Sequence, residues 1–237
     1  MAAPTFASLR SEYARLLATM TITSGKLATV DATAKKVLAN KARYMTVQNA
    51  TGVPWLLVGL IHSMEASLSF TKHLHNGDPL TARTVQVPKA RPVAGKPPFT
   101  WEESAIDAVR YDGLDKVTDW CDERIAYQLE GYNGWGYRLY HSDVLSPYLW
   151  SFTSHYRAGK YAADGKWSQT LVSQQVGAMA LLQRVRALDA GASPTPSVSK
   201  GTQVVVAVGA TAATTAAVTW WDQITAFFAP VLTFFGA

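Results

Sequence analysis

The chain has 237 residues, of which 48% are hydrophobic and 16% are charged, and this composition excludes a disordered or collagen-like protein. Its single cysteine, Cys121, excludes an intrachain disulfide and a four-cysteine zinc module. The 22 basic and 17 acidic side chains give a net charge of +5, which favours an anionic partner such as nucleic acid, a membrane or a cell-wall polymer.

The first ten residues lack a basic stretch followed by an apolar core, so they do not predict a secretory signal. After them the dominant hydrophobic period is helical. Pro54 lies in the first turn of a predicted helix, and Thr100 with Glu103 forms a capping box that begins another. The period predicts helices near residues 5–20, 26–50, 54–68, 101–112, 116–131, 147–157 and 168–188.

The segment from Thr71 to Pro98 is the exception to the helical pattern. Gly77-Asp78-Pro79 predicts a turn, and residues 81–87 alternate weakly between apolar and polar side chains, as a short strand does. We therefore expect a small hairpin or a long ordered loop in this segment. The predicted fold class is mainly α, with one small β element after the third helix.

The C-terminal part differs from the rest in composition. Residues 191–202 are rich in Pro, Ser and Gly and predict a linker, which leaves residues 1–190 as one domain. Residues 203–237 carry a single charge, Asp222, and residues 204–221 have the length needed to cross a bilayer. A membrane span followed by an interfacial segment is the preferred interpretation of this hydrophobic tail, against a helix that packs on the domain or on a partner.

Glu65 is the sharpest chemical feature of the sequence. On the predicted helix it shares a face with Ile61 and Val58, so a carboxyl group lies on an apolar stripe. Burial there would raise its pKa, as a general acid that works near neutral pH requires. The alternative is that Glu65 pairs with a basic group or lies at the solvent edge of the helix.

The residues after Glu65 form a polar turn, which includes His75, and they resemble the lysozyme-like superfamily. In that superfamily an acid at the end of a core helix faces a small hairpin across a polysaccharide cleft. Phage-type muramidases have an aspartate after the catalytic glutamate and a threonine six residues beyond it, and Asp78 and Thr84 reproduce that step. The interval from Glu65 to Asp78 is longer than in the best-known members, so Asp78 matches less closely than Glu65 does.

A second stretch, Tyr132-Asn133-Gly134, resembles the Tyr-Asn-Gly motif of lytic transglycosylases and goose-type lysozymes. That motif follows a helix and lines the sugar site opposite the acid. The family usually has alanine before the tyrosine, where this chain has Gly131. Together the resemblances cover about residues 50–160 and imply a lysozyme-like α+β fold. The substrate-binding residues that we expect from these segments are Tyr132, Asn133, Trp135 and His75.

The resemblance implies a peptidoglycan-cleaving muramidase, a phage or prophage endolysin that hydrolyses the bond between MurNAc and GlcNAc. Glu65 would protonate the glycosidic oxygen, while Asp78 with Thr84 would hold and activate a water on the opposite face. Two alternatives stay open. One is a lytic transglycosylase, which needs one carboxylate and forms 1,6-anhydro products, and the other is a non-catalytic, membrane-anchored wall-binding or structural protein on the same scaffold.

We expect no cofactor and no metal. His62, His73 and His75 lie close together in the sequence, but neither their spacing nor a further ligand supports a metal site. Cys121 has no motif of nucleophilic catalysis around it. We expect a monomer that binds peptidoglycan glycan strands and no nucleic acid. It would be made in the host cytoplasm, associate with the inner membrane through residues 203–237 and act on the periplasmic cell wall.

Overall fold

The computed structural model describes residues 3–163 and 165–191, and most of this part is helical. One pair of short antiparallel strands and two 3₁₀ turns complete the regular structure of the described residues. The elements in chain order are α1 (Phe6–Thr19), η1 (Ser24–Lys26), α2 (Leu27–Ala39), α3 (Lys41–Thr51), α4 (Trp55–Ala66), α5 (Trp101–Tyr111), η2 (Leu114–Lys116), α6 (Asp122–Asn133), α7 (Gly136–Tyr140), α8 (Pro147–Trp150), β1 (Lys160–Ala163), β2 (Lys166–Ser168) and α9 (Ala178–Asp189).

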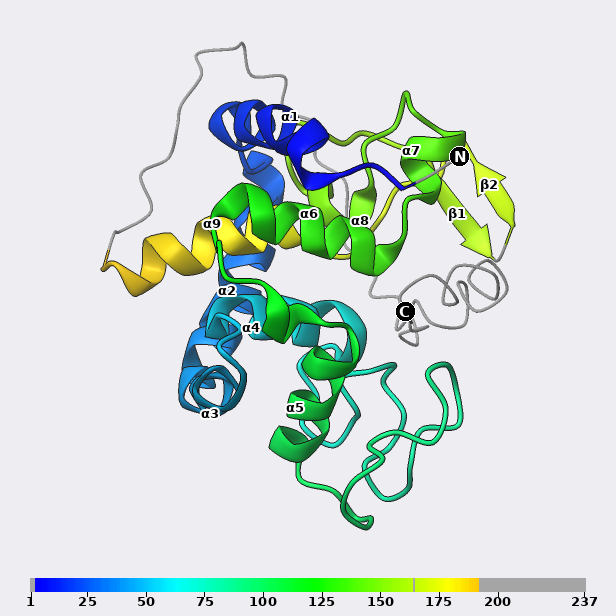
Figure 1. Ribbon diagram of the computed structural model, residues 1–237. Coiled ribbons are helices and arrows are strands. Elements are labelled where there is room, and N and C mark those ends of the chain that lie inside the picture. The colour runs from blue at the N-terminus through cyan, green and yellow to red at the C-terminus, as the bar shows by residue number, and fades with distance from the viewer. Residues whose placement is uncertain (1–2, 164, 192–237) are drawn as a thin grey trace, which may run out of the picture.

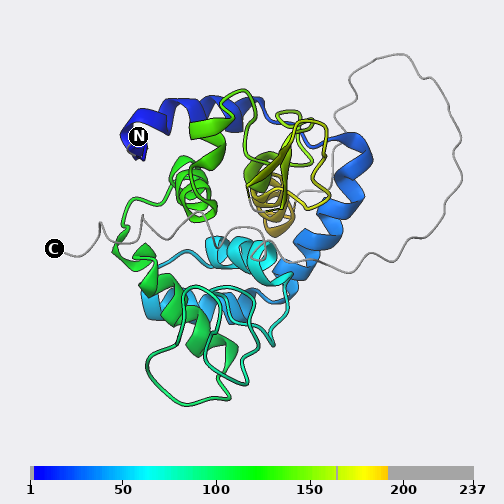
Figure 2. The same cartoon turned by 90° about the vertical axis from the view of Figure 1, so that its right-hand side faces the viewer.

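Helices α4 and α9 lie in the middle of the molecule (Figures 1 and 2). On one side are α1, α6 and the strand pair, and on the other are α3, α5 and the long loop of residues 67–100. Helix α9 packs against α2, α4 and α8, while α3 packs against both α4 and α5. The helix that carries Glu65 is therefore surrounded by helices from both halves of the chain.

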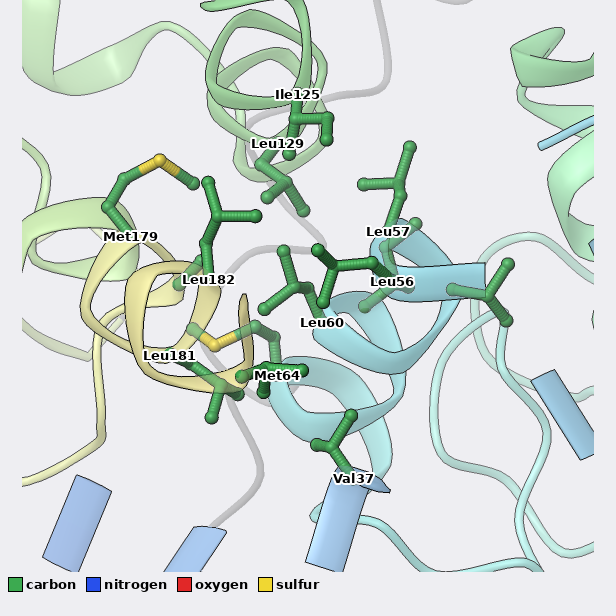
Figure 3. Close-up of a cluster of buried hydrophobic side chains, with 14 of the residues drawn as sticks. Val37, Leu56, Leu57, Leu60, Met64, Ile125, Leu129, Met179, Leu181 and Leu182 are labelled. Atoms are coloured by element: carbon green, nitrogen blue, oxygen red, sulfur yellow. The ribbon is translucent and has the colours of Figure 1, made fainter. Parts of the chain in front are cut away.

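The apolar sequence of α4 explains its central place. Ten of its residues are buried, among them Leu57 and Leu60, which are completely buried. Figure 3 shows Leu60 and Met64 of α4 close to Leu182 of α9 in one cluster of buried side chains. Because each fully buried leucine contributes about 1.5–3 kcal/mol, this packing fixes α4 firmly and with it the residues of its last turn.

The predicted helices exist, but several have different bounds. The helix expected over residues 26–50 is two helices, because the chain bends at Asn40, whose side-chain amide donates to the carbonyl of Lys36. The helix expected over 147–157 ends at Trp150, and Phe152 beyond it has a left-handed backbone (φ 66°). The helix expected over 168–188 begins only at Ala178. The helix expected over 116–131 begins at Asp122.

The prediction of a mainly helical fold with one small hairpin is confirmed, but the expected position of the hairpin was wrong. Residues 81–87 form no strand, and residues 67–100 are the long ordered loop that was the alternative. The strand pair lies at β1 and β2, where Lys160 pairs with Ser168 and Tyr161 with Trp167. In the loop, hydrogen bonds of Asp78 and Thr84 to the neighbouring backbone replace a strand ladder.

The predicted linker from residue 192 onward and the hydrophobic tail, residues 203–237, lie outside the described residues. Within residues 3–163 and 165–191, no helix is both long and apolar enough to pass through a bilayer.

The predicted capping box at the start of α5 is present and offers a test of local stability. The hydroxyl of Thr100 accepts a hydrogen bond from the amide of Glu103, and the Glu103 carboxylate accepts one from the amide of Thr100. Thr100→Ala is expected to lower the free energy of unfolding by about 1 kcal/mol, measured by urea denaturation. Thr46→Ala, on the exposed face of α3, is the control and should cost nothing. Equal losses in the two variants would contradict the capping role.

Candidate active site

Glu65 lies in the last turn of α4, and its residue is 6% exposed. The burial that its apolar stripe predicts is thus confirmed. The hydroxyl of Tyr148 in α8 donates a hydrogen bond of 2.7 Å to Oε1 of Glu65. This contact fixes the carboxyl group from the opposite half of the chain, 83 residues later.

The end of α4 turns the chain back over Glu65. Ser67 and Leu68 have left-handed backbones, at φ 51° and 61°, so the helix stops directly after Ala66. The returning loop places Gly77 against the backbone of Glu65, where an added Cβ would lie 3.1 Å from the carbonyl oxygen of Glu65. Gly77 also has φ 76°, so glycine suits this position both in backbone conformation and in space.

Two tyrosines interact with the carboxyl group of Glu65, Tyr148 through a hydrogen bond and Tyr132 electrostatically. Desolvation raises the pKa of Tyr132 well above its usual value, and the negative charges of Asp112 and Glu65 raise it further. Desolvation likewise raises the pKa of Tyr148, with the charge of Glu65 as the next cause. Both hydroxyls therefore stay protonated and act as hydrogen-bond donors, Tyr148 to Glu65 and Tyr132 to the carbonyl of Leu74 at 3.4 Å.

Asp112, directly after α5, is a second carboxyl group that interacts electrostatically with Glu65, and sequence reasoning missed it. The residue is exposed to solvent, yet desolvation by the surrounding protein is the largest cause that raises its pKa to about 7. The negative charge of Glu65 adds to the increase, while Arg91 opposes it. Tyr111-Asp112-Gly113 gave only the signal of a helix end.

Asp78 and Thr84 lie in the loop after α4, and both side chains hold that loop together. Oδ2 of Asp78 accepts hydrogen bonds from the amides of Val85 and Gln86 at 2.8 and 3.0 Å. The hydroxyl of Thr84, a buried residue, accepts one from the amide of Arg91 at 2.9 Å. All these hydrogen bonds are to backbone groups of the same loop, and neither side chain forms a hydrogen bond with Glu65. Activation of a water by Asp78 and Thr84 therefore stays a prediction.

The Tyr-Asn-Gly stretch lies at the end of α6, and its tyrosine interacts electrostatically with Glu65. Asn133 is buried and donates to the hydroxyl of Ser146 at 3.3 Å. Trp135 packs against Tyr127, with 5.2 Å between ring centroids. The same indole explains Gly131, because a Cβ at that position would lie 3.2 Å from the Trp135 ring. Sugar binding by Asn133 and Trp135 stays a prediction.

His75 is buried and forms part of an ionic cluster behind the loop. Its Nε2 lies 2.8 Å from Oδ2 of Asp107, whose two carboxylate oxygens also accept hydrogen bonds from Arg91. Burial lowers the pKa of His75 to about 4, although Asp107 opposes the shift. Neutral His75 therefore helps to order the loop. Because the side chain is buried, its predicted contact with substrate stays a prediction that the structure does not support.

In the described part of the chain, the candidate metal ligands and Cys121 do not form a site for a metal ion or for nucleophilic catalysis by a thiol. No three His, Cys, Asp or Glu side chains gather there as a metal ion would require. His73 instead contacts Ser104, with Nδ1 and Oγ 2.7 Å apart. Cys121 precedes α6, and burial raises the pKa of its thiol, so the reactive thiolate is disfavoured.

The buried histidines predict a loss of stability in mild acid. Burial lowers the pKa of His62 to about 4, as it does for His75, whereas an unfolded histidine has a pKa of 6.5. Between pH 6.5 and 4 the unfolded state binds more protons, so the free energy of unfolding falls as the pH falls. At pH 5, each of the two buried histidines is expected to lower the free energy of unfolding by roughly 2 kcal/mol. Urea denaturation at pH 7 and pH 5 measures the loss, and an equal loss in His62→Gln would refute the assignment to His62.

Comparisons of the chain with family models, with curated proteins and with solved structures find no match.

Proposed function

We propose that this chain is a peptidoglycan-cleaving glycosidase of the muramidase type, with Glu65 as the general acid. The observation that carries the proposal is the buried carboxyl group at the end of the core helix α4. It receives a hydrogen bond from Tyr148, and Asp112 and Tyr132 interact with it electrostatically. Such a carboxyl group can be held in the protonated form that donation to a leaving oxygen requires.

In the proposed reaction, Glu65 gives its proton to the oxygen between two amino sugars as the bond to the anomeric carbon breaks. The tyrosines on either side cannot take over this step, because desolvation keeps their hydroxyl groups far from ionisation. They would orient the carboxyl group and line the site. Hydrolysis then needs a water and a group that removes its proton.

Lytic transglycosylation is the second candidate, and one observation favours it. The carboxylate of Asp78, the predicted partner of the water, is engaged by the loop backbone. In transglycosylation the sugar's own hydroxyl group attacks, so the reaction needs no second carboxylate in that place.

Mass spectrometry of the fragments that the full-length chain releases from purified peptidoglycan tests the proposal. Muropeptides with reducing ends would support a muramidase, and 1,6-anhydro fragments would support a transglycosylase. If folded protein releases no fragments, the proposal fails, and the non-catalytic wall-binding protein becomes the better interpretation.

The proposal includes a location. Glycan strands are the expected partner, and the hydrophobic residues 203–237 would hold the protein at the inner membrane of the host, next to the wall. Cell fractionation tests this part separately. Full-length protein is expected in the membrane fraction, and protein that stays in the supernatant at high salt would contradict the anchor.

A further inference from the structure

An open cavity of about 330 Å³ lies among the segments that follow α7, α8 and β2. Most of its lining comes from residues 143–145 and 154–158, and Gln169 completes it. Neither Glu65 nor the tyrosine that binds it, Tyr148, belongs to this lining. Cavities of this size take small molecules or the end of a peptide, so this one is a candidate for a second binding site.

Hydrogen bonds to distant segments hold the wall of this cavity in place. The hydroxyl of Tyr156 accepts a hydrogen bond of 3.1 Å from the amide of Ser173, in the segment before α9. The neighbouring His155 is tied to α1, because its Nε2 lies 2.9 Å from the carbonyl oxygen of Leu16. A wall that is fixed before binding costs a ligand little ordering entropy.

Two oppositely charged side chains line the cavity, and the protein uses neither of them. The carboxylate of Asp143 and the guanidinium of Arg157 form no hydrogen bond or ion pair with any residue of 3–163 or 165–191. In contrast, Arg138 and Arg184 both bind carboxylates of their own chain. Asp143 and Arg157 are also exposed. Both charges are therefore available to a ligand, and they are too far apart to pair with each other.

These charges favour a ligand that carries both an ammonium group and a carboxylate. Asp143 can accept hydrogen bonds from the ammonium group, and Arg157 can donate two parallel hydrogen bonds to the carboxylate. Gln169 adds a donor, because its Oε1 already accepts the indole N–H of Trp167 at 3.0 Å while its amide N–H groups have no partner in the described part of the chain. A ligand with a single charge would leave one of the two residues unmatched. The side chain of Val144 offers contact to an aliphatic chain.

We propose that this cavity binds the uncross-linked end of a peptidoglycan stem peptide. The inference rests on the proposed function, because stem peptides are attached to the glycan strands that the chain would cleave. In walls built with diaminopimelate, the side chain of that residue ends in an ammonium group and a carboxylate on one carbon atom. Cross-linking converts the amino group into an amide, so the cavity would favour parts of the wall with few cross-links.

The test is isothermal titration calorimetry of the full-length chain with the synthetic peptide L-Ala-γ-D-Glu-meso-diaminopimelate-D-Ala, acetylated at its N-terminus. Asp143→Asn and Arg157→Gln are each expected to raise the Kd about tenfold, because each variant loses a charge-assisted hydrogen bond. The matched controls are Asp115→Asn and Arg15→Gln, which change exposed residues outside the cavity and should bind like the wild type. All four variants should keep the melting temperature of the wild type.

A second peptide, in which the diaminopimelate amino group is also acetylated, tests the contact with Asp143 directly. This acetylation should weaken binding to the wild type about tenfold and binding to Asp143→Asn much less, because the variant has already lost the partner of the ammonium group. Equal weakening for both proteins would contradict the contact. Free glycine that binds as tightly as the stem peptide would also overturn the inference, because the cavity would then recognise any free amino acid.

The inference and the proposed function can fail separately. If the wild type cleaves peptidoglycan but shows no saturable binding of the stem peptide, the cavity has no such role and the glycosidase stands. If the peptide binds through Asp143 and Arg157 but no glycan is cleaved, the cavity is supported and the chain is a wall-binding protein. With both in place, Asp143→Asn should raise the KM for peptidoglycan and leave kcat unchanged, because the residue would contact only the stem.

Discussion

Glu65→Gln is expected to slow the cleavage of purified peptidoglycan by about 10²–10⁴-fold, because the variant has no proton to give to the leaving oxygen. The fold should survive the change. Glutamine keeps an oxygen that can accept the hydrogen bond of Tyr148, and the two side chains have nearly the same shape. Release of soluble muropeptides, followed over time at equal protein concentrations, measures the effect.

The control for this variant is Glu123→Gln in the first turn of α6, which removes the same charge away from the site and should keep full activity. Thermal melting of both variants shows whether they are folded. A folded Glu65→Gln protein that still cleaves the wall at the wild-type rate would end the assignment of Glu65 as the acid. A rate loss matched by a collapse of the melting temperature would instead mark Glu65 as structural.

Among replacements of a described glycine by alanine, Gly177→Ala is expected to cause the largest loss of stability. An added Cβ would lie 2.5 Å from the carbonyl oxygen of Ser151 and 2.6 Å from that of Leu149. These are backbone atoms at the end of α8, so no side chain can move aside to relieve the overlap. We expect a loss of about 3 kcal/mol or more in the free energy of unfolding.

Thermal melting measures this loss, which corresponds to a fall of about 6–12 °C at roughly 2–4 °C per kcal/mol. Gly136→Ala is the matched control, because a Cβ there meets nothing within 4 Å and the residue begins α7. Because α8 also carries Tyr148, folded Gly177→Ala protein should lose activity as well. A melting temperature equal to that of Gly136→Ala would show that α8 and α9 separate easily.

The sequence predicted correctly those helices whose bounds depend on residues close together in the chain. The apolar run of α4 and the capping box of α5 gave both helices to within about two residues. The bend at Asn40 and the late start of α9 were missed, since apolar periodicity continues through both places. The strand pair could have been predicted from the sequence. Asp164-Gly165 is a dipeptide typical of a hairpin turn, and it lies between two short runs that each contain an aromatic residue.

Of the site residues, the sequence could predict only those whose surroundings follow from the residues of a single helix face. Glu65 could be found because its burial follows from the spacing of apolar residues on its own helix. Tyr148 contacts it from a separate element, and nothing in the sequence around Tyr148 indicates that tertiary contact. Asp78 was favoured for its position in a motif, but its hydrogen bonds depend on the path of a loop that the sequence left open.

The chain is synthesised from its N-terminus, so the central helix α9 is made after the helices that it packs against. This has a consequence for the cell that makes the protein. Gln175, just before α9, donates to the carbonyl of Met64, which is 111 residues earlier, and α9 itself packs against α4. A ribosome therefore releases the helix of Glu65 long before it releases the one that supports it. Nascent or prematurely terminated chains are therefore expected to be inert, and under the proposed function only a chain translated through residue 189 would attack the wall of its producer.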